Sequence, residues 1–335
     1  MRCCPVRRTA RSCGELAGNR LQERYEIIRV IGHGAMGTVY EARVLASGER
    51  VAIKWLHARA FAADDPDLLR FTQEARIASA LDSPHMTTLV ELARDSETQV
   101  PFLVMGLLRG EDVRGLLARV GPLRPDVAVR VAAQACAGLA AAHAAGVVHR
   151  DIKPENLFLA RGEGGAVVVK VLDFGIAKIR RTSEHTGASA GLTAPAASMT
   201  RSGEVVGTPL FMAPELLDGA KQADARSDVY SMGVTLYALL AGAPPHSGVE
   251  SLVKLLYLIV NEPPPPLAQA APWLAAGLTA IVEKTMAREK ALRYRSAAEM
   301  LEALQPFLPE GAALREEMLV GVDDEQRRAA PVRAG

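Results

Sequence analysis

The residues with the clearest chemical potential in this chain of 335 residues lie together at positions 149–156, His-Arg-Asp-Ile-Lys-Pro-Glu-Asn. This stretch places an acid (Asp151), a lysine (Lys153) and an amide (Asn156) at spacings of two and three residues. A carboxylate can accept a proton, a lysine can bind a phosphate, and an amide oxygen can bind a metal ion. The combination suits phosphoryl transfer, provided that other elements supply the missing parts.

A glycine-rich segment, Gly-His-Gly-Ala-Met-Gly at residues 32–37, lies near the start of the chain. Such a pattern opens a dinucleotide-binding fold only where a helix follows the third glycine. Here Thr38, Val39 and Tyr40 follow, and β-branched and aromatic residues favour a strand. We therefore expect a hairpin whose glycine backbone can approach phosphates, not a Rossmann fold. The alternative, an ordinary mobile hairpin turn, leaves the next lysine unexplained.

That lysine, Lys54, stands within the apolar strand-like sequence Val-Ala-Ile-Lys-Trp. On its own it could be a solvated charge that points outward. Glu74, however, lies beside Phe71 and Ala78 near the apolar face of the next predicted helix, where a carboxylate is costly unless it is paired. We expect Lys54 and Glu74 to form an ion pair.

The elements that must position these residues fall into two groups. Alternation and turn signals predict antiparallel strands at residues 25–31, 38–43, 50–55, 87–94 and 101–107. A helix is predicted to begin at Pro66 with Asp65 as its N-cap, and its apolar residues lie three and four apart up to Leu81. Helices then dominate, with predictions at residues 125–145, 227–240, 251–260, 272–287 and from Ser296 onward. The 227–240 helix is apolar nearly all round, which predicts a buried position.

The flanking segments and one long loop lack these patterns. Residues 1–24 read as a basic flexible arm and residues 309–335 as a flexible tail. A loop rich in Ser, Thr, Ala and Gly runs from residue 179 to 206, far above the usual connection length, and such loops are functional or disordered.

Composition limits the class of protein. The chain is 49% hydrophobic and 23% charged, which is typical of a globular domain. A net charge of +1 argues against nucleic acid or a membrane surface as the main partner. No run reaches the roughly 18 apolar residues of a membrane span, and the basic arm lacks the apolar region of a secretory signal. Four cysteines without metal-ligand spacing fit a reducing compartment, so we expect a cytoplasmic protein.

Taken in order, these motifs resemble those of the bacterial eukaryotic-like (Hanks-type) Ser/Thr protein kinases. The resemblance covers about residues 25–304 and is carried by the glycine-rich segment through Val39, Lys54, Glu74, the 149–156 stretch, Asp173-Phe174-Gly175 and Ala213-Pro214-Glu215. It implies an α+β bilobal kinase fold: a small antiparallel-sheet N-lobe plus one helix at residues 25–107, and a larger helical C-lobe at 108–308. Residues 173–215 would then be the activation loop.

The resemblance implies a role for each motif residue. Asp151 would accept or orient the proton of the substrate hydroxyl, and Lys153 would steady the γ-phosphoryl group, with Thr208 bonding near both. Lys54, held by Glu74, would bind the α- and β-phosphates of ATP. Asn156 and Asp173 would hold two Mg²⁺ ions, with Mn²⁺ as a substitute.

The same resemblance sketches a nucleotide pocket. Met105 matches the gatekeeper, Leu107 the hinge residue whose backbone meets adenine, and Asp112 the polar group that reaches the ribose. Gly106 departs from the family, which usually has glutamate there. The residues that would bind the nucleotide are Ile31, Gly32, Gly34, Gly37, Val39, Ala52, Lys54, Met105, Leu107 and Asp112.

Substrate class and regulation are also implied by resemblance. The 151–156 sequence and Gly207-Thr208-Pro209 are similar to those of Ser/Thr kinases, so the expected partners are proteins with Ser/Thr acceptors. A protein phosphatase and phosphothreonine-reading proteins are further expected partners. Arg150 is similar to an arginine that receives a phosphorylated activation loop, and Thr200 and Ser202 lie where related kinases autophosphorylate. The alternative is a Ser/Thr-rich loop that is never modified.

Two further contacts are implied by the resemblance. Glu215 and Arg293 resemble a buried ion pair that anchors the activation loop, and Asp228 resembles an aspartate that ties down the catalytic loop. Two other functions stay open: a pseudokinase that acts as a nucleotide-binding scaffold, and a small-molecule kinase of related fold. The intact Lys54, Asp151 and Asp173 argue against the first, and the intact 207–215 segment argues against the second.

Overall fold

The structure is a computed structural model, and it describes residues 20–34, 37–56, 77, 81, 83–96, 98–173, 209–217, 219, 222–323, 325 and 327. The chain divides into two compact units, Met1–Leu69 with Thr88–Leu108, and Arg70–Thr87 with Arg109–Gly335. The predicted partner Glu74, the predicted phosphosites Thr200 and Ser202, and Thr208 lie outside the described residues. Their predicted roles therefore stay predictions, as do the predicted boundaries between arm and lobes.

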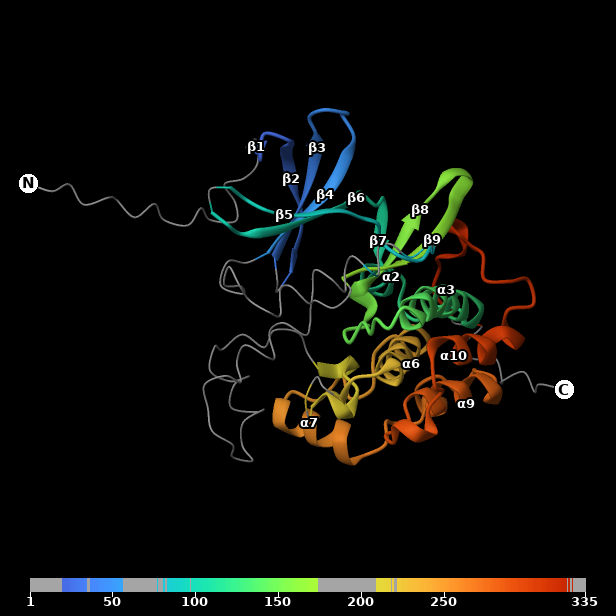
Figure 1. The fold of residues 1–335 in the computed structure, drawn as a ribbon. Helices are drawn as coiled ribbons and strands as arrows, with labels where there is room; N and C mark the ends of the chain where they lie inside the picture. The colour runs from blue at the N-terminus through green and yellow to red at the C-terminus, as the bar shows by residue number, and fades with distance from the viewer. Residues whose placement is uncertain are drawn as a thin grey trace, which may run out of the picture. The chain divides into compact units, whose positions relative to one another are not determined.

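The first unit contains a six-stranded antiparallel sheet in the order β1-β2-β3-β4-β6-β5 (Figure 1). The five segments that the sequence predicts as strands are strands, with ends that differ by a few residues at most, and a short edge strand precedes them. The strands are β1 (Arg20–Leu21), β2 (Tyr25–Gly34), β3 (Gly37–Val44), β4 (Arg50–Leu56), β5 (Leu89–Arg94) and β6 (Pro101–Gly106).

Successive side chains of a strand point to opposite faces of a sheet, and the two faces of this sheet carry different residues. One face carries a hydrophobic cluster in which the Phe102 ring meets Tyr25 edge-on and stacks on Trp55, with ring centroids 6.4 and 6.1 Å away. Ala52 and Lys54 of β4 lie on the opposite face. The buried members of the cluster are Leu21, Tyr25, Ile27, Tyr40, Ala42, Val51, Ile53, Phe102 and Val104.

The second unit is mostly helical and also contains a small four-stranded sheet in the order β10-β9-β8-β7 (Figure 1). Its helices are α2 (Val113–Val120), α3 (Pro125–Ala144), α6 (Ala225–Ala241), α7 (Leu252–Asn261), α8 (Leu267–Ala270), α9 (Ala276–Thr285) and α10 (Ala297–Leu304). Its strands are β7 (Gly110–Asp112), β8 (Leu157–Arg161), β9 (Ala166–Val171) and β10 (Leu314–Arg315). Short 3₁₀ turns are η2 (Pro154–Asn156), η3 (Glu163–Gly165), η5 (Pro209–Phe211), η6 (Pro214–Leu216), η8 (Lys290–Leu292), η9 (Gln305–Phe307) and η10 (Glu316–Met318).

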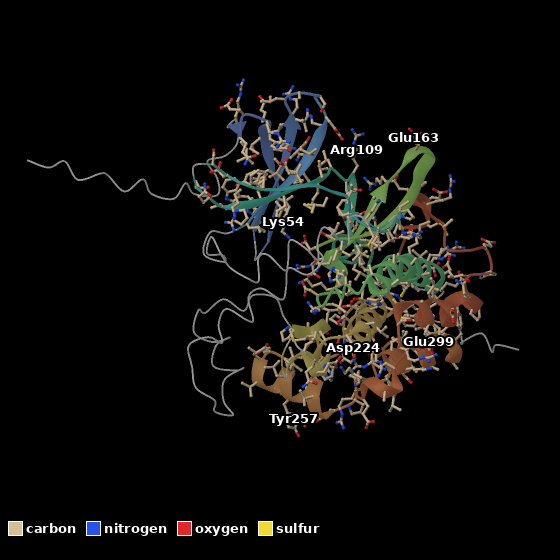
Figure 2. The ribbon with its side chains drawn as sticks, in the orientation of Figure 1. Lys54, Arg109, Glu163, Asp224, Tyr257 and Glu299 are labelled. Carbon is tan, nitrogen blue, oxygen red and sulfur yellow. The ribbon has the colours of Figure 1, made fainter. Side chains whose placement is uncertain are left out.

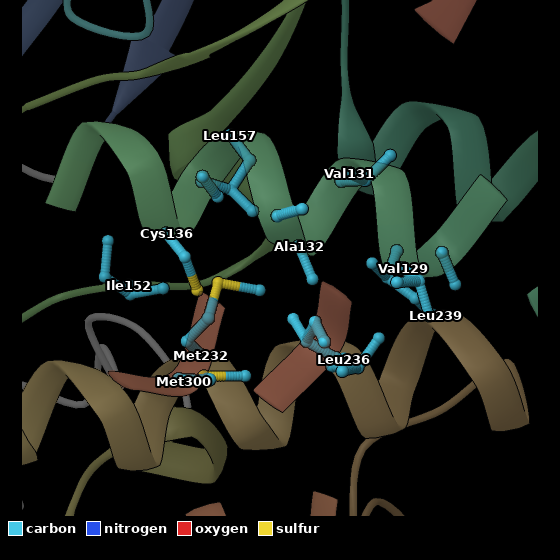
Figure 3. Close-up of a cluster of buried hydrophobic side chains, with 14 of the residues drawn as sticks. Val129, Val131, Ala132, Cys136, Ile152, Leu157, Met232, Leu236, Leu239 and Met300 are labelled. Carbon is cyan, nitrogen blue, oxygen red and sulfur yellow. The ribbon is translucent and has the colours of Figure 1, made fainter. Parts of the chain in front are cut away.

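Helices α3 and α6 form the centre of this unit. Figure 3 shows Ala132 and Cys136 of α3 directed toward Met232 and Leu236 of α6, and all four side chains are buried. The buried position predicted for the 227–240 helix is confirmed. Helix α6 begins with a capping box between Asp224 and Ser227 and ends at Gly242, whose φ of 86° is the left-handed conformation that glycine adopts without strain.

By length and composition alone, α3 could cross a membrane, although no membrane span is predicted from the sequence. In this structure α3 is a core helix, since 72% of its most apolar window is buried within the protein. Core helices of globular proteins pass the same test, so the helix is weak support for a membrane span.

The predicted flexible tail needs correction over residues 311–323, which we call the C-terminal strap. Its strand β10 pairs antiparallel with β9, and Leu314, Leu319 and Val322 are buried. The prediction failed because these apolar residues are five and three positions apart and are interrupted by charged residues, so they follow neither helical nor strand periodicity. Burial of three apolar side chains and completion of a sheet edge hold the strap in place.

Candidate active site

The predicted catalytic loop is anchored to the buried carboxylate of Asp228, in the first turn of α6. The backbone N–H groups of His149 and Arg150 donate to its two oxygens at 2.7 and 2.6 Å, and His143 Nε2 bonds to Oδ2 at 2.8 Å. Burial acts to raise the pKa of Asp228, but the hydrogen bonds from His143 and from the His149 backbone, together with the charge of His143, outweigh it and hold that pKa below its ordinary value. The buried anion is therefore fully partnered, and it fixes the start of the loop.

His149 links this loop to the segment that precedes Asp173. Its Nδ1 accepts a hydrogen bond from the backbone N–H of Asp151 at 3.2 Å, so Nε2 carries the proton and donates to Leu172 O at 2.6 Å. Arg150, between them, has a φ of 68°, an uncommon value for a residue other than glycine. The strained backbone persists because hydrogen bonds hold both of its neighbours.

The acid, the lysine and the amide of the motif meet around one carboxylate. Lys153 Nζ donates to Asp151 Oδ2 at 2.7 Å, and Asn156 Nδ2 donates to the backbone O and to Oδ2 of Asp151 at 2.6 and 3.0 Å. The Asp151 side chain is 40% exposed, so a substrate hydroxyl can reach its carboxylate. The structure thus places these three predicted residues together, with the charge of Asp151 balanced by Lys153.

Asn156 and Asp173 lie at the same end of the β8–β9 hairpin. Leu157 pairs with Val171 across the hairpin, and Leu172 N donates to Asn156 O at 2.9 Å. Because the amide nitrogen of Asn156 bonds to Asp151, its Oδ1 is the atom left for a metal ion. A carboxylate with an amide oxygen is a donor set that fits Mg²⁺, which is usually bound through one or two carboxylates plus substrate phosphates.

In the first unit, four of the predicted nucleotide residues, Val39, Ala52, Lys54 and Met105, lie on the sheet face opposite the hydrophobic cluster. Lys54 is 6% exposed and pairs across strands with Val39 and Leu103, while Ala52 pairs with Met105 (Figure 2 locates Lys54). Gly32 of β2 pairs with Val39 of β3, Ile31 precedes Gly32 within β2, and Leu107 directly follows β6. Lys54 is thus buried in the sheet face that also carries Val39, Ala52 and Met105.

The three glycines of the β2–β3 hairpin differ in the space around them. A Cβ on Gly37 would lie 2.2 Å from the backbone oxygen of Trp55, so only glycine fits against β4. Among the residues that the structure describes, a Cβ on Gly34 or Gly32 would meet nothing closer than 3.6 Å. Gly37 is therefore explained by strand packing, and only the other two leave room for a ligand's phosphates.

Asp112 has a structural task that the sequence did not reveal. It is the N-cap of α2, and its Oδ1 accepts a hydrogen bond from Gly115 N at 2.7 Å. A cap of this kind satisfies a backbone N–H at the start of a helix. Its predicted contact with a ribose stays a prediction.

The ion pair expected between Glu215 and Arg293 is present and bidentate. Arg293 Nη1 and Nη2 lie 2.9 and 3.0 Å from the two carboxylate oxygens, and Ser227 Oγ donates to Oε1 at 2.7 Å. Burial acts to raise the pKa of Glu215, but these hydrogen bonds and the Arg293 charge lower it overall. The pair fixes the segment that follows the predicted activation loop.

Sequence reasoning missed three buried polar residues of α3: Arg130, Gln134 and His143. His143 supports Asp228, while Arg130 and Gln134 bind the backbone of the C-terminal strap. The signal was present, because a polar side chain within an Ala-rich buried helix needs a hydrogen-bond partner.

The comparisons with known proteins identify the family. The family model of the protein kinase domain matches residues 25–302, and the chain belongs to the protein kinase family. It is 37% identical over 286 residues to the serine/threonine-protein kinase PknB of Mycobacterium tuberculosis, which covers 84% of this chain and 42% of that protein. It is 38% identical over 311 residues to the serine/threonine-protein kinase Pkn1 of Myxococcus xanthus, which covers 92% of this chain and 41% of that protein.

A solved structure has a similar fold. The crystal structure of the Mycobacterium tuberculosis PknI kinase domain matches with a TM-score of 0.64 and 27% identity, covering 87% of this chain and 98% of that one. The predicted kinase fold and the resemblance to Ser/Thr kinases are confirmed. This chain spans less than half of the length of the two curated relatives.

Proposed function

We propose that this chain is a protein kinase that transfers the γ-phosphoryl group of ATP to Ser and Thr hydroxyls of protein substrates, with Mg²⁺ as cofactor. The observation that carries the proposal is the cluster of Lys153 and Asn156 around the exposed carboxylate of Asp151. The family membership and the serine/threonine kinases among its relatives support it.

In the proposed reaction, the substrate hydroxyl oxygen attacks the γ-phosphorus while the bond from that phosphorus to the β–γ bridging oxygen breaks. ADP leaves, and Asp151 takes the proton of the hydroxyl. The positive charge of Lys153 lies beside the carboxylate and balances the negative charge of the transferred phosphoryl group. Lys54 binds the α- and β-phosphates. Asn156 and Asp173 would hold Mg²⁺, whose charge offsets that of the phosphates.

The leading test compares wild type with Asp151→Asn in transfer of labelled γ-phosphate to a generic basic protein. Asn keeps the size of the side chain but cannot accept the proton, so the rate should fall by about 10²–10⁴-fold. Asp126→Asn is the matched control, because it neutralises an acid outside the site. A folded wild type that binds ATP but transfers nothing would instead favour the pseudokinase scaffold.

We further propose autophosphorylation of Thr200 or Ser202, with Arg150 receiving the phosphate. A phosphate adds a charge of about −1.5 to −2 and pairs strongly with arginine. Phosphopeptide mapping after incubation with Mg·ATP tests this idea, with Thr200→Ala and Ser202→Ala as separate variants. Absence of phosphate from both residues would remove it.

Location and further partners are proposals of the same kind. Use of ATP as donor favours the cytoplasm, and reversal of the modification would need a protein phosphatase. Phosphothreonine-reading proteins would be the partners that detect it. Fractionation of cells, with blotting for this chain, tests the location directly.

A further inference from the structure

Strand β9, which leads into Asp173, is held along the edge that faces away from β8 by separate parts of the chain. Strand β10 of the C-terminal strap pairs with its first residues, Ala166 and Val167. The Gln134 side chain then accepts a hydrogen bond from Val169 N at 2.8 Å. Segment 85–87 completes the edge, because Val171 N donates to His85 O at 2.9 Å and Thr87 Oγ1 donates to Val171 O at 3.1 Å.

Gln134 couples the strap to β9 through a single amide group. While Oε1 accepts from Val169, its Nε2 donates to Ala312 O at 2.7 Å. The side chain is almost fully buried, so neither bond is easily replaced by water. Movement of the strap at Ala312 must therefore break a buried hydrogen bond or turn the amide that holds β9.

The strap is fastened on both sides of this contact. Arg130 Nη1 donates to the backbone oxygens of Gly311 and Ala313, and Val322 N donates to Pro122 O at 2.8 Å. Near its end, Gly321 packs so closely that a Cβ would lie 2.1 Å from Val120 O. These contacts make the strap part of the second unit, although the family match ends at residue 302.

We propose that the C-terminal strap, acting through Gln134, positions β9 and thereby Asp173 for metal binding. Only three residues separate Val169 from Asp173, and Leu172 among them is bonded to both His149 and Asn156. A displacement of β9 would move Asp173 relative to Asn156, and Mg²⁺ tolerates little departure from octahedral geometry. Gln134 is thus a positioning residue, and the inference rests on the proposed function for its metal.

The test uses the full chain with two independent lesions. Gly321→Ala forces the end of the strap away from Val120 and leaves Gln134 intact, while Gln134→Leu removes both amide bonds at similar size. Gly248→Ala is the control, because a Cβ there meets no atom of the described part of the chain within 4 Å. Three quantities are measured: hydrogen exchange over residues 166–173, the Mg²⁺ concentration for half-maximal binding of a fluorescent ATP analogue, and the same midpoint for phosphoryl transfer.

We expect both lesions to speed exchange in β9 and to raise both Mg²⁺ midpoints by roughly 10-fold, as when outer partners of metal ligands are removed. Excess Mg²⁺ should restore the rate, which it would not do for misfolded protein. Unchanged exchange and unchanged midpoints in both variants would overturn the proposal. If wild type binds Mg·nucleotide but transfers no phosphate, the proposed function fails while exchange and binding still decide the role of the strap.

Discussion

Asp228 Oδ2 accepts a hydrogen bond from the backbone N–H of His149 over 2.7 Å, although the two residues lie 79 positions apart in the sequence. The same carboxylate holds Arg150 N through its other oxygen. The position of the predicted catalytic loop is thus set from a fully buried helix and not from the surface.

Replacing Asp228 by Asn should loosen this loop. An amide has one acceptor oxygen, so its NH₂ group would face one of the N–H donors that the carboxylate now satisfies. We expect the free energy of unfolding to fall by about 3–5 kcal/mol, the range for breaking one partner of a buried charged pair. Urea denaturation measures the loss, and transfer assays should show a lower rate. An Asp228→Asn variant as stable and active as the exposed control Asp126→Asn would contradict the anchor role.

The Glu215–Arg293 pair should make stability depend on pH in acid. The folded pKa of Glu215 is lowered from 4.5, so the unfolded state binds more protons in this window and stability rises with pH. The contribution is complete above the unfolded pKa and is lost as pH falls through the folded one. We therefore expect the stability difference between wild type and Glu215→Gln to shrink below about pH 4.5.

Urea titrations at successive pH values measure that difference. Glu23→Gln, in an exposed surface pair, provides the control and should show little difference at any pH. A Glu215→Gln difference that stays constant from neutral pH down into acid would rule out the linkage.

The hairpin glycines should separate stability from nucleotide binding. Gly37→Ala places a Cβ against the Trp55 backbone, so we expect a lower melting temperature. Gly34→Ala meets no such obstacle and should leave the melting temperature nearly unchanged, while it weakens ATP binding because the backbone can no longer approach the phosphates. Thermal melts and ATP titrations of the two variants give the comparison. Equal melting temperatures of the two variants would show that the close packing of Gly37 against Trp55 does not contribute to stability.

Cys136 should be inert in the folded protein. Complete burial in α3 raises the pKa of its thiol to about 12, so it carries almost no thiolate at neutral pH. Alkylation followed by peptide mass spectrometry should find Cys136 unmodified in the native state and modified in urea. Rapid labelling of Cys136 without denaturant would show that α3 opens readily.

The sequence predicted best what local patterns determine. The strands of the first unit follow alternation and turn residues, and Asp151, Lys153 and Asn156 come together because they lie within six consecutive residues that end in one short turn. The Glu215–Arg293 pair joins distant positions, and only the resemblance to a family indicated it. The bidentate geometry of this pair could be known only from the folded structure.

The features that the sequence did not predict depend on tertiary contacts. Gln134 looked like one polar position in an apolar helix, and its role follows from two backbone segments that no local pattern brings near it. Asp112 was predicted to contact a ribose, and its carboxylate caps α2. An aspartate before a helix can do either, so the sequence alone did not reveal the cap. The pairing of Lys54 with Glu74 stays a prediction, since Glu74 lies outside the described residues.

The pairing of β10 with β9 has a practical consequence for anyone who shortens this chain. A protein cut at residue 302, where the family match ends, would lose β10 and leave the backbone of Ala166 and Val167 as an open sheet edge. Open edges recruit strands from other molecules, so such a fragment should be prone to self-association and poor recovery on purification. Expression should therefore extend through at least Val322.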